Sequence, residues 1–280
     1  DNSNSGDDFN SIDSNNENFV DTDNKDDLSV SNSQEDNNLK VSESKSSLDQ
    51  FLDDIENYKS GTIYIKDNIV ITETITISKP MTIDGKGHSI SSNNCCRIFN
   101  INAVTTLKNI VFKDASSKSG GAIYSTAKLS INNCQFLNNK ASSYGGAIYS
   151  VGVLVVKNSK FTNNKAGKSG GAIFVDGILT LSGSYFGLHK ASTFGRALYT
   201  VGESATISNS KFENNSVKSN TGSVGGGAIY ALANTKISSS VFNNNFCKYT
   251  KRLSRTYQSS GGAILYSKGN HTIRFSTFNG

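Results

Sequence analysis

A four-residue segment, Gly-Gly-Ala-Ile, recurs along the chain and constrains the fold more than any other feature. It begins at residues 120, 145, 170, 226 and 261, and Gly195-Arg196-Ala197-Leu198 fills the gap. A phenylalanine keeps phase with it and follows an aliphatic residue by five positions, giving Phe112, Phe136, Phe161, Phe186, Phe212, Phe242 and Phe278. The regular interval of 25 residues is too short for a unit that closes its own core, so successive units must stack.

Each unit contains short alternating strands, such as 122–125 and 129–131, with glycine and asparagine turns between them. Stacked as coils, each strand pairs with its equivalent about 4.8 Å away. We therefore predict an all-β parallel β-helix of about eight coils. Hairpin-built sandwiches and propellers are alternatives, although a propeller blade needs about 40 residues. Equivalent residues then form rows, an aliphatic row inside one wall (Ile123, Ile148, Ile173, Leu198, Ile229, Ile264) and a phenylalanine row at a corner.

Asparagine pairs lie two and three residues past four of these phenylalanines: 138–139, 163–164, 214–215 and 244–245. Asparagine tolerates left-handed turns, and its amide can bond to the same amide in the next coil. The paired glycines allow a positive φ or a close backbone approach before the strand.

Three segments are predicted. Residues 1–46 are a disordered leader rich in Asp, Asn and Ser, and residues 1–45 hold 12 of the 23 acids but only 3 of the 28 bases. Residues 47–60 are a capping helix, because Leu48, Phe51, Leu52, Ile55 and Tyr58 share one face, with Ser47 and Gln50 in capping-box spacing. Residues 61–280 are the β-helix.

Cofactors and membrane spans are not expected. No apolar stretch reaches 18 residues, which predicts no membrane insertion in this segment. The chain starts at Asp1 and stops just after a repeat phenylalanine, so we expect a fragment. The four cysteines lack CxxC spacing, so they predict buried free thiols and no metal site, with a bridge involving Cys134 or Cys247 as the alternative.

The alternation of Gly-Gly-Ala-Ile with Phe-x-x-Asn resembles the repeats of chlamydial polymorphic outer-membrane proteins, which are autotransporter-type adhesins. With Met81 to His88 opening the repeats and the acidic leader, residues 47–280 resemble the adhesin-like surface proteins of methanogenic archaea. The resemblance implies a right-handed, pectin-lyase-like β-helix in an extracellular, cell-surface protein. It also implies non-enzymatic adhesion to a glycan or protein of a host or neighbouring cell, with anchoring by regions outside this segment.

A polysaccharide lyase or hydrolase is the first alternative, because pectate lyases and polygalacturonases share this fold. Those reactions need paired carboxylates, or clustered ones that hold calcium. From residue 60 onward no two acids share a repeat phase in neighbouring coils: Asp67, Glu73, Asp84, Asp114, Asp176, Glu203 and Glu213. Asp84 is interpreted as a turn residue beside two glycines, with a ligand or catalytic role as the alternative. We expect no enzyme activity, and a structural stalk is the second alternative.

Two groups of residues are candidate binding sites within the regular coils. Lys140, Lys165 and Lys190 lie four residues past their phenylalanines, so stacking would form a row that meets either solvent or an anion. His189 replaces the second asparagine of its coil and Arg196 replaces a glycine. With Tyr185 they form either a binding spot or simple repeat drift.

A longer insertion is the third candidate. The distance from phenylalanine to Gly-Gly is 9 residues in regular coils, 14 from Phe212 and 19 from Phe242. Rings stack on sugars, and bases pair with carboxylates or phosphates. No nucleic-acid-binding motif accompanies the charge. The segment 246–258 is either a tolerated insertion or a recognition loop that binds through Lys248, Tyr249, Lys251, Arg252, Arg255 and Tyr257.

Overall fold

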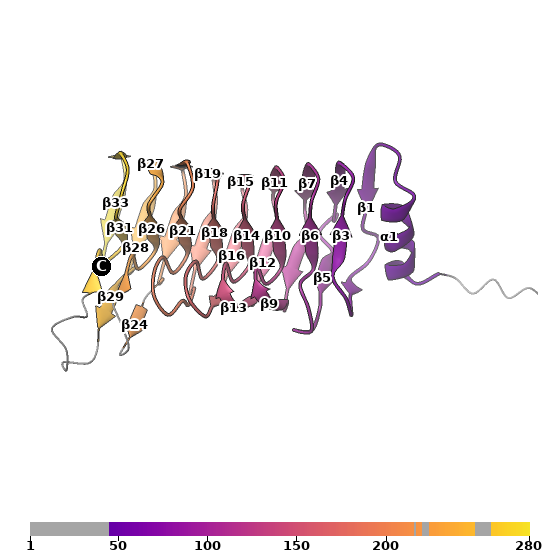
Figure 1. Ribbon diagram of the computed structural model, residues 1–280, viewed down its shortest axis with the longest axis horizontal. Helices are drawn as coiled ribbons and strands as arrows, with labels where there is room; N and C mark the ends of the chain where they lie inside the picture. The colour runs from indigo at the N-terminus through magenta and orange to yellow at the C-terminus, as the bar shows by residue number, and fades with distance from the viewer. Residues whose placement is uncertain (1–44, 216, 220–223, 250–258) are drawn as a thin grey trace, which may run out of the picture. The chain divides into compact units, whose positions relative to one another are not determined.

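The computed structural model describes residues 45–215, 217–219, 224–249 and 259–280. They belong to the compact unit Ser44–Gly280, and most of the predicted leader lies outside them. This unit is an all-β parallel β-helix with one short helix at its N-terminal end (Figure 1). The predicted fold class is confirmed.

Three long parallel sheets form the walls, and each strand pairs with its equivalent one coil further on. The first wall consists of β1 (Thr62–Tyr64), β4 (Met81–Asp84), β7 (Thr105–Lys108), β11 (Leu129–Asn132), β15 (Val153–Lys157), β19 (Ile178–Ser182), β22 (Ser204–Ser208), β27 (Asn234–Ser238) and β32 (His271–Arg274). The second consists of β3 (Ile75–Ile77), β6 (Phe99–Ile101), β10 (Ile123–Ser125), β14 (Ile148–Ser150), β18 (Ile173–Val175), β21 (Leu198–Thr200), β26 (Ile229–Ala231) and β31 (Ile264–Tyr266). The third consists of β2 (Ile69–Val70), β5 (Ser89–Ser91), β8 (Val111–Lys113), β12 (Gln135–Leu137), β16 (Lys160–Thr162), β20 (Tyr185–Gly187), β23 (Lys211–Glu213), β28 (Val241–Asn243) and β33 (Thr277–Asn279).

Two walls hold nine strands and one holds eight, so the coil count differs slightly from the predicted eight. Shorter strands lie on the connection from the third wall to the second, along the lower edge in Figure 1. One set pairs β9 (Ser116–Ser119), β13 (Lys140–Tyr144) and β17 (Lys165–Ala166). Further along, β24 (Val217–Ser219) pairs with β29 (Cys247–Tyr249), and β25 (Val224–Gly225) pairs with β30 (Ser259–Ser260). We call this fourth face the side strip.

The core consists of stacked rows, as the repeat predicted. Strand register places Ile123, Ile148, Ile173, Leu198, Ile229 and Ile264 in one row of the second wall. In the third wall the rings from Phe112 to Phe278 stack with centroids 4.6 to 4.9 Å apart. They occupy the middle of three-residue strands. The prediction that they lie at a corner was wrong, because the asparagines that follow them form the corner.

The two asparagines of each pair have separate roles. The first is left-handed, with φ between 51° and 57° at Asn138, Asn163, Asn214 and Asn244. The second is buried and bonds between coils, as Asn164 shows. Its Oδ1 accepts from the backbone N–H and the amide of Asn139 at 2.9 and 3.0 Å, while its own amide donates to the carbonyl of Phe136 at 3.0 Å. The predicted amide ladder is present.

The two glycines of a pair have different roles: the first adopts a positive φ and the second allows a close backbone approach. Gly145, first of its pair, has a φ of +61°. Gly146 sits where a Cβ would lie 2.1 Å from the carbonyl oxygen of Gly171 in the next coil. A side chain at Gly146 would therefore clash with the next coil, whereas the equivalent position two coils further on holds Arg196.

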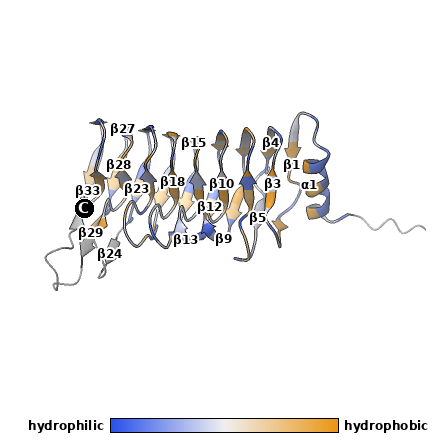
Figure 2. Ribbon diagram, in the orientation of Figure 1, coloured by the Kyte–Doolittle hydropathy of each residue, from blue (hydrophilic) through white to orange (hydrophobic). Residues whose placement is uncertain are grey.

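The helix α1 (Ser47–Glu56) covers the first coils. Its N-cap is Ser46, whose side chain accepts from the N–H of Asp49, so the predicted capping box at Ser47 and Gln50 is displaced by one residue. Figure 2 shows α1 with hydrophobic and hydrophilic residues on different sides. Phe51 is buried and its ring lies 6.5 Å from that of Phe99. The helix thereby closes the end of the apolar core.

Candidate binding surface

The three predicted lysines form a row on the side strip. Lys140 pairs in register with Lys165, and Lys165 forms a β-bridge with Lys190. All three are exposed, and adjacent strands lie about 4.8 Å apart. The structure therefore brings these residues together as their spacing predicted, and we call them the lysine row.

Alternating burial explains why these lysines point outward. In each coil the residue before the lysine is buried in the amide ladder, at Asn139, Asn164 and His189. The residue after it is a buried alanine, at Ala141, Ala166 and Ala191. Successive side chains of an extended segment face opposite sides, so the lysine between two buried residues must face solvent.

No acidic side chain among the described residues neutralises the charge of the lysine row. None of the ion pairs among the described residues involves Lys140, Lys165 or Lys190. The one polar side-chain contact described for the row is from Nζ of Lys140 to Oδ1 of Asn94, at 3.0 Å. Like charges opposite one another on neighbouring strands repel, so an anion placed over the row relieves that repulsion.

His189 does not belong to this surface. The structure places its side chain inside the β-helix with 1% exposure. Its ring Nδ1 accepts from the backbone N–H of Asn164 at 3.1 Å. The backbone N–H of His189 donates to Oδ1 of Asn215, also at 3.1 Å. Burial lowers the pKa of His189 to about 3, although hydrogen bonds with the backbone of Asn164 and Phe161 partly offset this effect by raising it. The ring therefore stays neutral. The histidine replaces a ladder asparagine and cannot contact a surface ligand.

Arg196 and Tyr185 do not belong to the surface of the lysine row either. Arg196 is 8% exposed, and burial lowers its pKa to about 10, while the charge of Cys247 raises it. The hydroxyl of Tyr185, on the third wall, donates to Oε2 of Glu213 at 3.2 Å. The predicted spot made by these two residues and His189 is therefore not assembled.

The basic insertion is described only in part. Lys248 and Tyr249 end strand β29, whose register pairs Lys248 with Lys218 of β24. Sequence reasoning missed this register, although Lys218 and Lys248 both lie six residues past their phenylalanines. Lys251, Arg252, Arg255 and Tyr257 lie outside the described residues.

An aromatic row on the outer face of the second wall was also missed. Tyr124, Tyr149, Phe174, Tyr199 and Tyr230 stack with centroids 4.8 to 5.3 Å apart and interplanar angles of 5° to 15°. The signal was present, because each directly follows the aliphatic residue of the four-residue repeat. Ring faces inside the row are occupied by neighbouring rings, and Arg97 covers the outer face of Tyr124 at 5.2 Å. A sugar cannot stack on these faces, so the row stabilises the wall.

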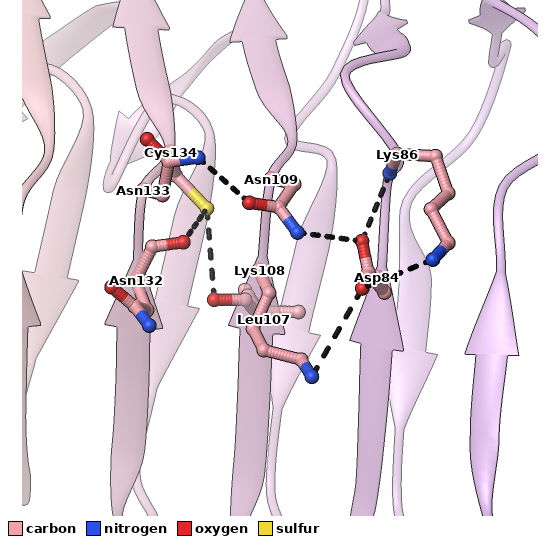
Figure 3. Close-up of polar contacts among 8 residues, drawn as sticks. All are labelled: Asp84, Lys86, Leu107, Lys108, Asn109, Asn132, Asn133 and Cys134. Carbon is pink, nitrogen blue, oxygen red and sulfur yellow. Dashed lines mark hydrogen bonds and ion pairs between the residues drawn. The ribbon is translucent and has the colours of Figure 1, made fainter.

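Asp84 was the acid with the strongest alternative interpretation as a ligand or catalyst. Figure 3 shows its carboxylate between Lys86, Lys108 and Asn109. The N–H of Lys86 and the amide of Asn109 donate to Oδ1 at 3.0 and 2.9 Å. Burial raises the pKa of Asp84, but these hydrogen bonds and the two lysine charges outweigh burial and hold the pKa below its usual value. The contact with Lys86 is that of a turn residue.

Asp84 also begins a second column of hydrogen-bonded side chains, at the corner between the first and third walls (Figure 3). Asn109, which bonds to Asp84, accepts in turn from the amide of Asn133 at 2.7 Å. The thiol of Cys134 lies behind this corner, 3.6 Å from the carbonyl of Leu107. Among the residues described, no group of three His, Cys, Asp or Glu side chains is placed to hold a metal ion.

Comparisons with known proteins agree with the repeat. Residues 42–149 match the model of a putative pectate lyase-like adhesive domain. Residues 158–176 and 209–232 match the Chlamydia polymorphic membrane protein repeat, and each match spans one Phe-x-x-Asn and the next Gly-Gly-Ala-Ile. No curated protein and no solved structure gives a match. The part of the chain that the structure describes holds no helix long and apolar enough to cross a membrane. The chain is thus similar to a pectate lyase-like adhesive domain in its first half and to polymorphic membrane protein repeats in two segments of its second half.

Proposed function

We propose that this chain is the binding part of an extracellular adhesin-like surface protein, and that it holds acidic polymers through the lysine row. The polymer belongs to the glycan coat of a host or neighbouring cell. The observation that carries this proposal is the in-register stacking of three exposed lysines, Lys140, Lys165 and Lys190, without an ion-pair partner among the described residues. The similarity to an adhesive domain supports the same class of function.

The charge distribution supports an anionic partner. From residue 115 onward the sequence holds eighteen Lys and Arg residues but only three acids, Asp176, Glu203 and Glu213. Glu213 is paired with Lys211 at 2.9 Å. This part of the sequence therefore carries an excess of positive charge, which attracts polyanions and raises their association rate.

The geometry favours an extended polymer that runs along the stack of coils. Successive lysine backbones are about one strand spacing apart, about 4.8 Å. A chain with one anionic group every few ångströms can meet all three lysines at once. Each exposed contact is weak, about 1 kcal/mol or less, so useful affinity arises from several contacts and from many copies on one surface.

Binding of the complete chain to immobilised acidic and neutral polysaccharides, at low and high salt, tests the proposal. The triple variant Lys140→Gln, Lys165→Gln, Lys190→Gln should lose about tenfold in affinity, equal to about 1.4 kcal/mol. The matched control is Lys128→Gln, Lys157→Gln, Lys236→Gln, which removes the same charge from exposed positions at the first wall. Equal losses in both variants would show general charge attraction, and no loss in either would favour the structural stalk.

The same assay separates the remaining alternatives. A variant that lacks residues 246–258 should lose further affinity if the basic insertion recognises the polymer, and should bind unchanged if it is a tolerated insertion. The similarity to a pectate lyase-like domain keeps a lyase as the second candidate. Release of unsaturated sugar products during incubation would overturn the non-enzymatic proposal.

A further inference from the structure

Two adjacent cysteines bring their sulfur atoms together in the turn between β5 and β6. The Sγ atoms of Cys95 and Cys96 lie 2.6 Å apart, and both cysteines are free. Cys95 is exposed and Cys96 is half-buried. The prediction that the cysteines are buried is therefore wrong for this pair, although it holds for Cys134.

The turn itself holds the pair in this arrangement. Adjacent residues of a strand face opposite sides, but left-handed Asn93 and Asn94, with φ of 49° and 64°, break the strand just before the pair. The N–H of Cys95 donates to the carbonyl of Ser92 at 2.9 Å. The carbonyl of Cys96 accepts from the hydroxyl of Ser92 at 2.6 Å and from the N–H of Ser116 in the next coil at 3.1 Å. Both sulfurs therefore lie together without further ordering of the chain.

We propose that Cys95 and Cys96 form a thiol redox site that closes into a disulfide between adjacent residues. The oxidant is a small dialkyl disulfide such as oxidised glutathione. The thiolate of Cys95 attacks one sulfur of the oxidant, which forms a mixed disulfide and releases one thiol. The sulfur of Cys96 then attacks Sγ of Cys95, loses its proton and expels the second thiol. Two cysteine thiols are oxidised, and one dialkyl disulfide is reduced to two thiols.

The order of the two attacks follows from exposure. Cys95 is open to solvent, so an oxidant can reach its sulfur. Burial, together with the neighbouring Cys95, raises the pKa of Cys96 to about 11, so its thiolate is scarce at neutral pH. Cys96 therefore acts second, when its target sulfur is already in contact. This inference does not depend on the proposed adhesive function.

Tryptic mapping of the complete chain tests the site directly. Cleavage after Lys86 and Arg97 releases both cysteines in one peptide, residues 87–97. After incubation with oxidised glutathione and blocking of free thiols, this peptide should be lighter by two hydrogens and unblocked. A reductant should reverse the change. In Cys96→Ser the reaction should stop at a glutathione adduct on Cys95.

Three results would overturn the inference. The peptide could keep two blockable thiols under conditions that oxidise an exposed reference dithiol. It could instead accumulate stable glutathione adducts in the wild-type chain, or be cross-linked to the peptide of Cys247. The matched control Cys134→Ser, which removes a buried thiol, should leave oxidation of the pair unchanged.

Discussion

The backbone N–H of Asn164 donates a hydrogen bond to Nδ1 of His189 at 3.1 Å, so an imidazole continues a ladder otherwise made of asparagine amides. In the other coils an amide oxygen fills this role, as Asn164 does for Asn139. A ladder asparagine never titrates, whereas histidine does. The coil that contains His189 is therefore the one whose buried ladder is sensitive to pH.

The free energy of unfolding should fall below pH 6.5 because of His189. Burial lowers its folded pKa to about 3, so between these values the unfolded chain binds a proton that the folded chain does not. Stability should decrease as pH falls, by about 1.4 kcal/mol per unit and about 2 kcal/mol at pH 5. Urea denaturation at pH 7 and pH 5 measures this loss, which His189→Asn should remove. Persistence of the full loss in that variant would contradict the assignment, and His88→Asn serves as the control.

The buried asparagine ladder, formed by the second asparagine of each pair, should contribute far more to stability than the exposed bonds between the first asparagines. Asn164→Ala removes the Oδ1 that accepts from both the backbone N–H and the side-chain amide of Asn139 in the core. Each buried donor that loses its acceptor costs about 1–3 kcal/mol, so the loss should reach about 2–6 kcal/mol. Asn163→Gly keeps the left-handed turn and loses one exposed bond to Asn138, at 2.8 Å. That control should cost less than about 1 kcal/mol, and similar losses in both variants would argue against separate roles.

Periodicity predicted the stacked rows because every coil repeats the same residue at the same phase, as with Ile123 and Phe136. It could not tell which asparagine of a pair points inward, since both are polar and both suit a turn. For that reason the sequence left a surface binding spot at His189 open, although the residue occupies the buried position. The vicinal thiols of Cys95 and Cys96 were also missed, because their proximity depends on two left-handed residues outside the regular repeat.

The arrangement of the lysine row could be predicted from the sequence, whereas the arrangement of the residues around Arg196 could not. Lys140, Lys165 and Lys190 share one phase in coils of equal length, so register alone fixes their positions. Arg196 and His189 belong to one coil, and both side chains are buried. Spacing between coils fixes which residues stack, but it does not tell which residues of one coil share the outer surface.

Gly146→Ala should destabilise the chain strongly, although φ is not the reason. An added Cβ would lie 2.1 Å from the carbonyl oxygen of Gly171 and 2.6 Å from that of Lys165, both backbone atoms of the next coil. Relief requires separation of two coils, so we expect a loss above about 4 kcal/mol. Arg196→Gly restores the repeat residue at the equivalent position and should be nearly neutral. Thermal melts compare the two variants, and a tolerated Gly146→Ala would refute the close approach.

The phenylalanine row should stabilise the β-helix most where each ring has two neighbours. Phe161 is fully buried, and its ring lies 4.6 Å from both Phe136 and Phe186. Phe161→Ala should cost about 3–5 kcal/mol for the buried ring, with about 0.5–1.5 kcal/mol for each lost stack. Phe278 is 47% exposed, and among the described residues its ring stacks on Phe242 alone, at 4.8 Å. Phe278→Ala should therefore cost about 1–2 kcal/mol, and equal losses in urea denaturation would mean that burial and stacking do not set the energy of the row.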